Sequence, residues 1–220
     1  YQFQAQYIPD GSSYFEAVSS DVEQVAVTAP VGWSENFDSY AVGTYIHGQG
    51  GWQNIDAPNY NTRLKVSNAV PAHSGSNSLE LTAQSGQRDL RIVGRAFPQA
   101  AGGVWEVSFW YYTNSGSMNT ERAMFQIDSE LYARDLRCSG EWLFLPDDSM
   151  WPTSIVPNAT WVPVRWQVDL DKHTCQVWFD GTLVYTGVFP AASLTFVVGS
   201  LNGPIVNGYI DDVSITPFTP

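Results

Sequence analysis

The residues that decide the fold are Trp161–Gly187, WVPVRWQVDLDKHTCQVWFDGTLVYTG. Along 162–170 every second residue is apolar, which is the pattern of a β-strand with one buried face. Asp180-Gly181 separates two further strand-like runs, 174–179 and 183–186. An Asp-Gly pair favours a type I′ hairpin, because both central residues of that turn have positive φ. The stretch therefore predicts antiparallel β-structure.

The same signals extend along the chain in both directions. Turn-forming residues recur about every 8–15 positions, and the chain contains 18 Gly and 13 Pro. No window keeps a helical period. We therefore expect an all-β fold, a two-sheet antiparallel β-sandwich of the jelly-roll kind with about twelve strands. The β-branched and aromatic runs that predict these strands are 63–66, 78–82, 88–97, 104–113, 121–128, 142–145, 162–170, 174–179, 183–186, 194–198 and 209–215.

The two ends of this β-rich region are expected to be neighbours. Gly32–Gln53 contains a strand-like segment, Ser34–Tyr40, and Gly208–Thr216 (GYIDDVSIT) forms the last one. In a β-sandwich the first and last strands often pair. Residues 1–31 alternate only weakly, and they predict a hairpin or an arm at the start of a single 1–220 domain.

The charge balance excludes several partners. The net charge is −12, and all ten basic residues fall between Arg63 and Lys172. A protein without a basic excess is not expected to bind nucleic acid or an anionic membrane surface. No apolar run is long enough to span a bilayer, so we expect no membrane insertion.

The chain has two cysteines, Cys138 and Cys175, without the spacing of a metal site. We expect them to form one disulfide, which would indicate an oxidising, extracellular compartment. The alternative is two buried thiols. Cys175 shares its parity with Val177 and Phe179, so it is expected to point inward.

Several segments together resemble one family. They are NFDSYAVG at 36–43, GQGGW at 48–52, VWEVSFWY at 104–111, the run 161–187 and YIDDVSI at 209–215. These segments are similar to those of concanavalin A-like, laminin-G-like jelly-roll domains of secreted, mainly bacterial proteins. The resemblance covers Trp33 to Thr216 and implies the architecture. It leaves the activity open, because the family includes carbohydrate-binding modules, lectin-like domains, glucanases and polysaccharide lyases.

The resemblance also implies a structural calcium ion, which jelly-roll carbohydrate modules often hold between the first and last strands. Glu35, Asp38, Asp211 and Asp212 supply the hard oxygen donors that Ca²⁺ prefers. Asp38 and Asp211 are the best candidates, because each directly follows an apolar residue. The same carboxylates could instead protect strand edges from aggregation.

A polar face is predicted on Glu121–Arg134, ERAMFQIDSELYAR. The resemblance implies that such a face lines a cleft. Gln126–Glu130 resembles the Glu-Ile-Asp-x-Glu carboxylate series of laminarinase-like glycoside hydrolases. Gln126 replaces its first carboxylate, however, and an amide cannot act as the nucleophile.

The same face partly resembles the cleft of jelly-roll alginate lyases, which act by β-elimination. Arg122, Gln126 and Arg134 would neutralise a uronate carboxylate, and Tyr132 would serve as base and acid. Asp128 stands where those lyases have a histidine, and their Arg-x-Glu-Leu-Arg element is missing from the sequence. If the protein is an enzyme, the catalytic candidates are Tyr132, Gln126, Asp128, Glu130 and Arg122, with lyase ahead of hydrolase activity.

Our interpretation is an extracellular module that binds a polysaccharide on an aromatic and polar sheet face. Alternation along 104–112 puts Trp110 and Tyr112 on a face opposite the apolar residues, where a flat ring can stack on a sugar. The expected ligand-binding residues are Trp110, Tyr112, Arg122, Gln126, Asp128 and Arg134. The remaining hypothesis is a surface-layer or filament subunit that assembles through residues 1–31.

Overall fold

The computed structural model describes residues 2–3, 23–24, 31–55, 64–81, 91–97, 100, 102–114, 122–127, 136–139, 142–152, 155–189, 191, 193–201 and 208–218. These residues form sixteen strands and no helix. The chain divides into two compact units, residues 1–30 and 31–220. In the first unit β1 (Gln2–Phe3) pairs antiparallel with β2 (Glu23–Gln24), which agrees with a hairpin at the start of the chain. Self-assembly through this segment stays a prediction.

The second unit consists of two antiparallel sheets. The eight-stranded sheet has the order β14 (Thr182–Val188), β13 (Thr174–Phe179), β12 (Thr160–Asp169), β8 (Val104–Thr113), β16 (Gly208–Pro217), β6 (Ser78–Glu80) and β5 (Lys65–Ser67), and β3 (Trp33–Glu35) also pairs with β16. The six-stranded sheet has the order β11 (Trp142–Phe144), β10 (Leu136–Ser139), β9 (Arg122–Gln126), β15 (Leu194–Leu201), β7 (Arg91–Phe97) and β4 (Gln53–Asn54). The predicted all-β sandwich is confirmed.

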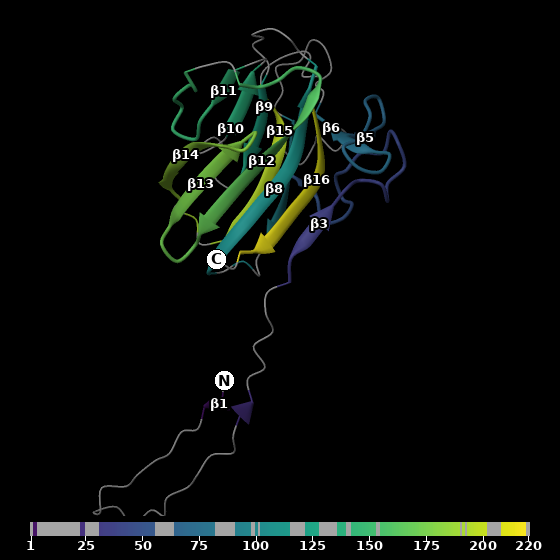
Figure 1. Cartoon of the computed structure of the whole chain (residues 1–220). Coiled ribbons are helices and arrows are strands. Elements are labelled where there is room, and N and C mark those ends of the chain that lie inside the picture. The colour runs from purple at the N-terminus through teal and green to yellow at the C-terminus, as the bar shows by residue number, and fades with distance from the viewer. Residues whose placement is uncertain are drawn as a thin grey trace, which may run out of the picture. The chain divides into compact units, whose positions relative to one another are not determined.

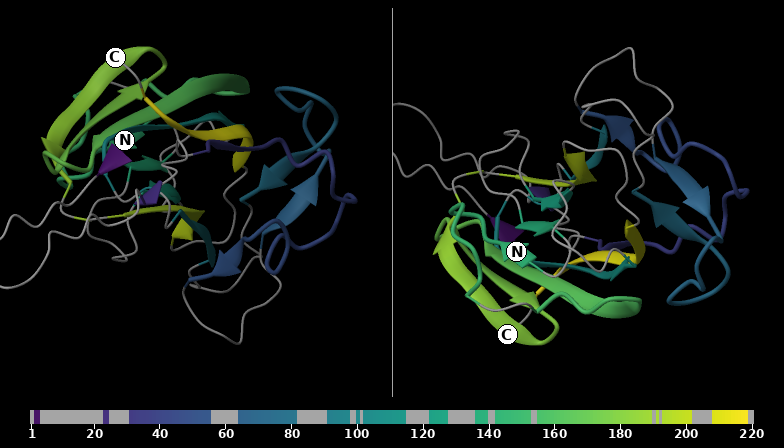
Figure 2. Two further views of the ribbon diagram at one scale, coloured as in Figure 1. Left: turned by 90° about the horizontal axis from the view of Figure 1, so that it is seen from below. Right: turned by 90° about the horizontal axis from the view of Figure 1, so that it is seen from above.

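Figure 1 looks onto the eight-stranded sheet, in which β12, β8 and β16 run side by side. Figure 2 shows the two sheets as layers, with β5 and β6 at one side of the sandwich. None of the residues that the structure describes belongs to a helix long and apolar enough to cross a bilayer.

Alternation along the central strands builds the core between the sheets. On β8 the residues Trp105, Val107, Phe109 and Tyr111 are each at most 1% exposed. The Phe109 ring lies 4.7 Å from that of Phe125 on the six-stranded sheet, measured between ring centroids. The faces predicted for the strands at 104–113 and 162–170 are therefore confirmed, because a period of two puts all of these residues on one side.

Two local predictions are also confirmed. Asp180 and Gly181 have φ angles of 48° and 73°, as a type I′ turn between β13 and β14 requires. The first strand of the sandwich pairs with the last, with Ser34 opposite Ser214. That first strand is shorter than predicted, however: it ends at Glu35 because Phe37 has a φ of 61° and its N–H donates to the Glu35 carboxylate.

The predicted disulfide is wrong. Cys138 lies on β10 of the six-stranded sheet and Cys175 on β13 of the eight-stranded sheet, and both are buried thiols that are not bonded to each other. Burial raises the pKa of the Cys138 thiol well above its ordinary value, so it stays protonated. Secretion stays a prediction that now rests on the family resemblance.

Candidate functional site

The outer face of the eight-stranded sheet, which points away from the six-stranded sheet, carries a continuous row of polar side chains. Strand register places five residues side by side across β16, β8, β12, β13 and β14. On β8, β12 and β13 the residues on both sides of the row are buried, so alternation forces Glu106, Gln167 and Gln176 outward, and Thr216 and Thr186 continue the row at its two ends. We call this set the polar row; it consists of Thr216, Glu106, Gln167, Gln176 and Thr186.

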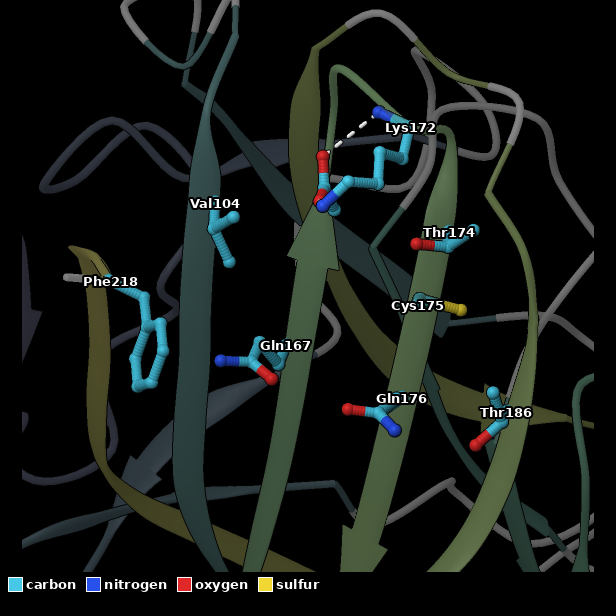
Figure 3. A pocket seen from close by; sticks show the side chains of 9 residues that line it. Val104, Gln167, Lys172, Thr174, Cys175, Gln176, Thr186 and Phe218 are labelled. Atoms are coloured by element: carbon cyan, nitrogen blue, oxygen red, sulfur yellow. Dashed lines mark hydrogen bonds and ion pairs between the residues drawn. The ribbon is translucent and has the colours of Figure 1, made fainter. Parts of the chain in front are cut away.

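A cavity of about 460 Å³ opens on this face. Figure 3 shows the Gln167 and Gln176 side chains next to each other, between Phe218 on one side and Thr186 on the other. The volume of this cavity falls within the range of small-molecule binding sites. We call it the sheet pocket; its lining residues are Val104, Gln167, Asp169, Lys172, Thr174, Cys175, Gln176, Thr186 and Phe218.

The two charged residues of the sheet pocket neutralise each other. The Lys172 ammonium lies 2.8 Å from a carboxylate oxygen of Asp169, and the Lys172 backbone N–H donates to the other oxygen at 2.9 Å. The hydrogen bond from the ammonium lowers the pKa of Asp169, and the same bond raises the pKa of Lys172. Both groups therefore remain ionised at neutral pH, as a closed pair at the end of β12.

A second pair of opposite charges joins β12 and β8 on the same face. The Arg165 guanidinium lies 3.5 Å from the Glu106 carboxylate. Its carbon also lies 3.9 Å from the centroid of the Trp178 ring, which is a cation–π contact. Like Lys172, this cation is engaged by a neighbouring carboxylate.

The opposite end of the outer face is aromatic, and a loop covers part of it. The His73 ring stacks on Trp110 with centroids 3.8 Å apart and planes 14° from parallel. The Trp161 indole N–H donates to the Pro71 carbonyl at 2.9 Å, and Tyr112 packs against Trp161. Trp110 and Tyr112 thus lie on the outer face, but His73 covers one face of the predicted Trp110 platform.

The carboxylates predicted as calcium ligands hold this loop, residues 71–77. Asp211 is fully buried and accepts the backbone N–H groups of His73 at 2.9 Å and Ser74 at 3.2 Å. Asp38 accepts those of Ser76 at 2.8 Å and Asn77 at 2.9 Å. Asp38 and Asp211 thus bind neighbouring parts of one loop, and their role as calcium ligands stays a prediction.

Calcium binding itself stays a prediction for all four carboxylates. Among the described residues no three His, Cys, Asp or Glu side chains converge on one point. Glu35 and Asp212 nevertheless line a second cavity of about 400 Å³ where β3 meets β16. Carbonyl and hydroxyl oxygens can complete the six to eight ligands that Ca²⁺ requires.

Calcium added to chelator-treated protein is expected to raise the midpoint of thermal unfolding, because a ligand of the native state stabilises it by mass action. Glu35→Gln is expected to abolish that rise, and Asp38→Asn to leave it intact. Differential scanning calorimetry with and without CaCl₂ provides the measurement, with MgCl₂ as the control salt. An unchanged midpoint in the wild-type protein would dismiss the calcium prediction.

The cleft predicted on 121–134 is only partly described. Ala123, Phe125 and Ile127 face the core as predicted, and Gln126 lies on the other face of the six-stranded sheet with 0% exposure. Arg122 belongs to the same strand, β9. Asp128, Glu130, Tyr132 and Arg134 lie outside the described residues, so their roles stay predictions.

The structure does not bring the expected binding residues together. Trp110 and Tyr112 lie on β8 of the eight-stranded sheet, whereas Arg122 and Gln126 lie on β9 of the six-stranded sheet. Gln126 has the opposite parity to Phe125, whose ring packs in the core, so the Gln126 side chain points away from the sheet that carries Trp110 and Tyr112. A single site that combines them is therefore not formed.

The residues of the sheet pocket were not predicted as a site, although the alternation of the sequence indicates where some of them point. Alternation along 162–170 already places Gln167 and Asp169 on the outer face. A regular two-residue Asp-Gly hairpin would pair Gln176 with Tyr185, and a register shift between Val177 and Trp178 places Gln176 opposite Thr186 instead. The sequence holds no local signal for Phe218, which reaches the pocket because β16 lies beside β8 and its N–H donates to the Val104 carbonyl.

Comparison with known proteins identifies the fold. No protein-family model matches the chain, and no curated protein sequence matches it. Among solved structures, the cellulose-induced protein Cip1 superposes with a TM-score of 0.59 and 21% identity, over 84% of this chain and 97% of that one. The chain has a concanavalin A-like jelly-roll fold.

Two further structures share this fold. An alginate lyase of polysaccharide lyase family 7 superposes with a TM-score of 0.59 and 12% identity, over 80% of this chain and 99% of that one. A sialidase superposes with a TM-score of 0.60 and 14% identity, over 86% of this chain and 19% of the sialidase chain. At these identities the likeness concerns the fold, and function has to be argued from the site.

Proposed function

We propose that the protein is a carbohydrate-binding module that holds a polysaccharide in the sheet pocket. The observation that carries the proposal is the pair of adjacent amides, Gln167 and Gln176, in a cavity with Phe218 at one side. Amides donate and accept hydrogen bonds as sugar hydroxyls do, and an aromatic ring provides a flat apolar surface for a sugar ring. Two proteins that share the fold have names that refer to polysaccharides, cellulose and alginate, which agrees with a glycan partner.

Binding without hydrolysis is the better interpretation of this pocket. Glycoside hydrolysis needs a protonated carboxylic acid with a raised pKa beside a second carboxylate. Asp169 has the opposite property, a pKa lowered by its bond to Lys172, and Glu106 faces Arg165. Asp169 is therefore not suited to donate a proton to a leaving group, and it is the one carboxylate among the residues that line the pocket. Lyase activity through 121–134 stays an alternative whose key residues lie outside the described part of the chain.

Removing both amides, in the double variant Gln167→Ala and Gln176→Ala, is expected to weaken polysaccharide binding at least ~10-fold. Each lost hydrogen bond to the ligand costs ~0.5–1.5 kcal/mol. Retention on insoluble polysaccharides and affinity gel electrophoresis with soluble ones provide the measurement. The matched control is Gln53→Ala, an exposed glutamine on β4 of the other sheet, which is expected to bind as the wild type does.

Each result has a defined meaning. Loss of binding in the double variant and normal binding by Gln53→Ala would support the sheet pocket as the site. Equal binding by the double variant and the wild type would place the site elsewhere. New unsaturated or reducing ends in the same incubations would contradict a purely binding role and turn attention to Tyr132.

A further inference from the structure

We infer that the ligand of the sheet pocket is a neutral polysaccharide lying across the strands along the polar row, and not a polyuronate. The inference rests on the proposed function and names the class of glycan that this site selects. Three properties of the outer face support the inference. They are the hydrogen-bonding groups of the polar row, the two ion pairs beside it, and the extension of the row to the sheet edge at β14.

From its centre to its β14 end, the polar row consists of uncharged groups that both donate and accept hydrogen bonds. Gln167 and Gln176 are opposite each other on β12 and β13, and Thr186 follows on β14. An amide has two donor hydrogens and a carbonyl acceptor, and a hydroxyl donates once and accepts twice. This combination matches a chain of sugar hydroxyls, each of which also donates and accepts.

The two described cations nearest the polar row, Lys172 and Arg165, each already face a protein carboxylate. Lys172 is bound by Asp169 at 2.8 Å, and Arg165 lies 3.5 Å from Glu106, so the two pairs sum to zero. A uronate carboxylate that approached either cation would also meet the protein carboxylate already bound there, so the net attraction would be small. The net charge of −12 also repels a polyanion at a distance. Neutral chains meet neither obstacle.

The geometry of the row favours a chain over a single sugar. The row crosses five strands, which at ~4.8 Å between neighbouring strands corresponds to a length of ~19 Å. β14 is the last strand of its sheet, so no further strand follows Thr186 on that side among the described residues. Phe218 lies toward the other end of the pocket, where a sugar ring can stack on it (Figure 3). An extended neutral glycan can therefore start over Phe218 and leave across the sheet edge.

The test compares soluble neutral chains, namely mixed-linkage β-glucan, xylan and glucomannan, with the polyuronates alginate and polygalacturonate. We expect the wild type to bind at least one neutral chain with an affinity that changes less than ~2-fold between low and high NaCl, since no ion pair is formed. Binding to both polyuronates is expected to be at least ~10-fold weaker.

A charge variant sharpens the test. Asp169→Asn removes the partner of Lys172, so it is expected to gain salt-sensitive affinity for polyuronates. The matched control is Asp180→Asn, which removes one negative charge at the exposed β13–β14 turn outside the pocket and is expected to leave selectivity unchanged.

Different results would contradict the neutral class of glycan and the proposed binding function. Tight, salt-sensitive binding of a polyuronate by the wild type, lost in the Gln167→Ala and Gln176→Ala double variant, would overturn the neutral class and leave the proposed function standing. An Asp169→Asn variant whose selectivity equals that of Asp180→Asn would also count against the charge argument. Binding of no polysaccharide by the wild type would overturn the proposed function and this inference with it.

Discussion

Replacing Trp166 by alanine is expected to lower the free energy of unfolding by about 3–5 kcal/mol, the cost of truncating a large aromatic in a packed core. Trp166 is 1% exposed and lies on β12, between Val107 of β8 and Val177 of β13. Its ring stacks on Phe109 at 6.1 Å, so truncation opens a cavity that neighbouring strands cannot fill without breaking their pairing. Urea denaturation followed by tryptophan fluorescence and circular dichroism provides the measurement.

The matched control is Trp178→Ala, a tryptophan of the adjacent strand that points to the outer face. Trp178 is half-buried and packs on Arg165, so its removal costs mainly one cation–π contact and some apolar area. We expect a loss of about 1–2 kcal/mol. Equal losses in the two variants would contradict the assignment of opposite faces to Trp166 and Trp178.

Asp211→Ala is the second substitution with a large expected effect, a loss of about 3 kcal/mol. The Asp211 carboxylate is fully buried and accepts three backbone N–H groups, those of His73, Ser74 and Asp212. Alanine leaves all three donors without their acceptor and releases the loop 71–77 from the sheet. Besides a lower denaturation midpoint, we expect faster amide hydrogen exchange at His73 and Ser74.

The control for this variant is Asp38→Ala, which removes a half-buried carboxylate that binds the same loop. Asp38 also accepts backbone N–H groups, from Ser76 and Asn77, but water can replace it there. We expect a loss of about 1 kcal/mol. If Asp38→Ala destabilised the protein as much as Asp211→Ala, burial would not be the cause of the larger effect.

The two carboxylates should also respond to pH in opposite directions. Burial raises the pKa of Asp211 to about 6, so the folded protein binds a proton that the unfolded chain releases, and its contribution to stability falls as pH rises from about 4 to 6. The backbone N–H of Ser76 lowers the pKa of Asp38, so its contribution is lost as pH falls below about 4.

Urea unfolding of the wild type, Asp211→Asn and Asp38→Asn separates the two effects. A range from about pH 3 to about pH 7 brackets both titrations. Relative to Asp211→Asn, the wild type is expected to be more stable at the acidic end than at neutral pH. Relative to Asp38→Asn, the wild type is expected to be more stable at neutral pH than at the acidic end. Parallel pH profiles for all three proteins would show that neither carboxylate titrates differently in the folded state.

Much of the local structure could be predicted from the sequence because it depends on neighbours along the chain. Alternation placed Trp166 in the core and Gln167 outside, and the structure confirms both. The Asp180-Gly181 turn was predicted from the φ preferences of two adjacent residues. The early end of the first strand was missed, since the backbone turn at Phe37 depends on a hydrogen bond to the Glu35 side chain.

The sequence by itself determined that this protein is an antiparallel β-sandwich and which side chains of each strand face its core, because a period of two needs no knowledge of the partner strand. Only the tertiary structure decided which strands are neighbours. It placed Cys138 and Cys175 on different sheets, separated Trp110 from Gln126, and aligned Gln167 with Gln176 in a pocket that Phe218 also lines. Pairing between distant strands is selected by the packing of the whole core, and no local pattern encodes it.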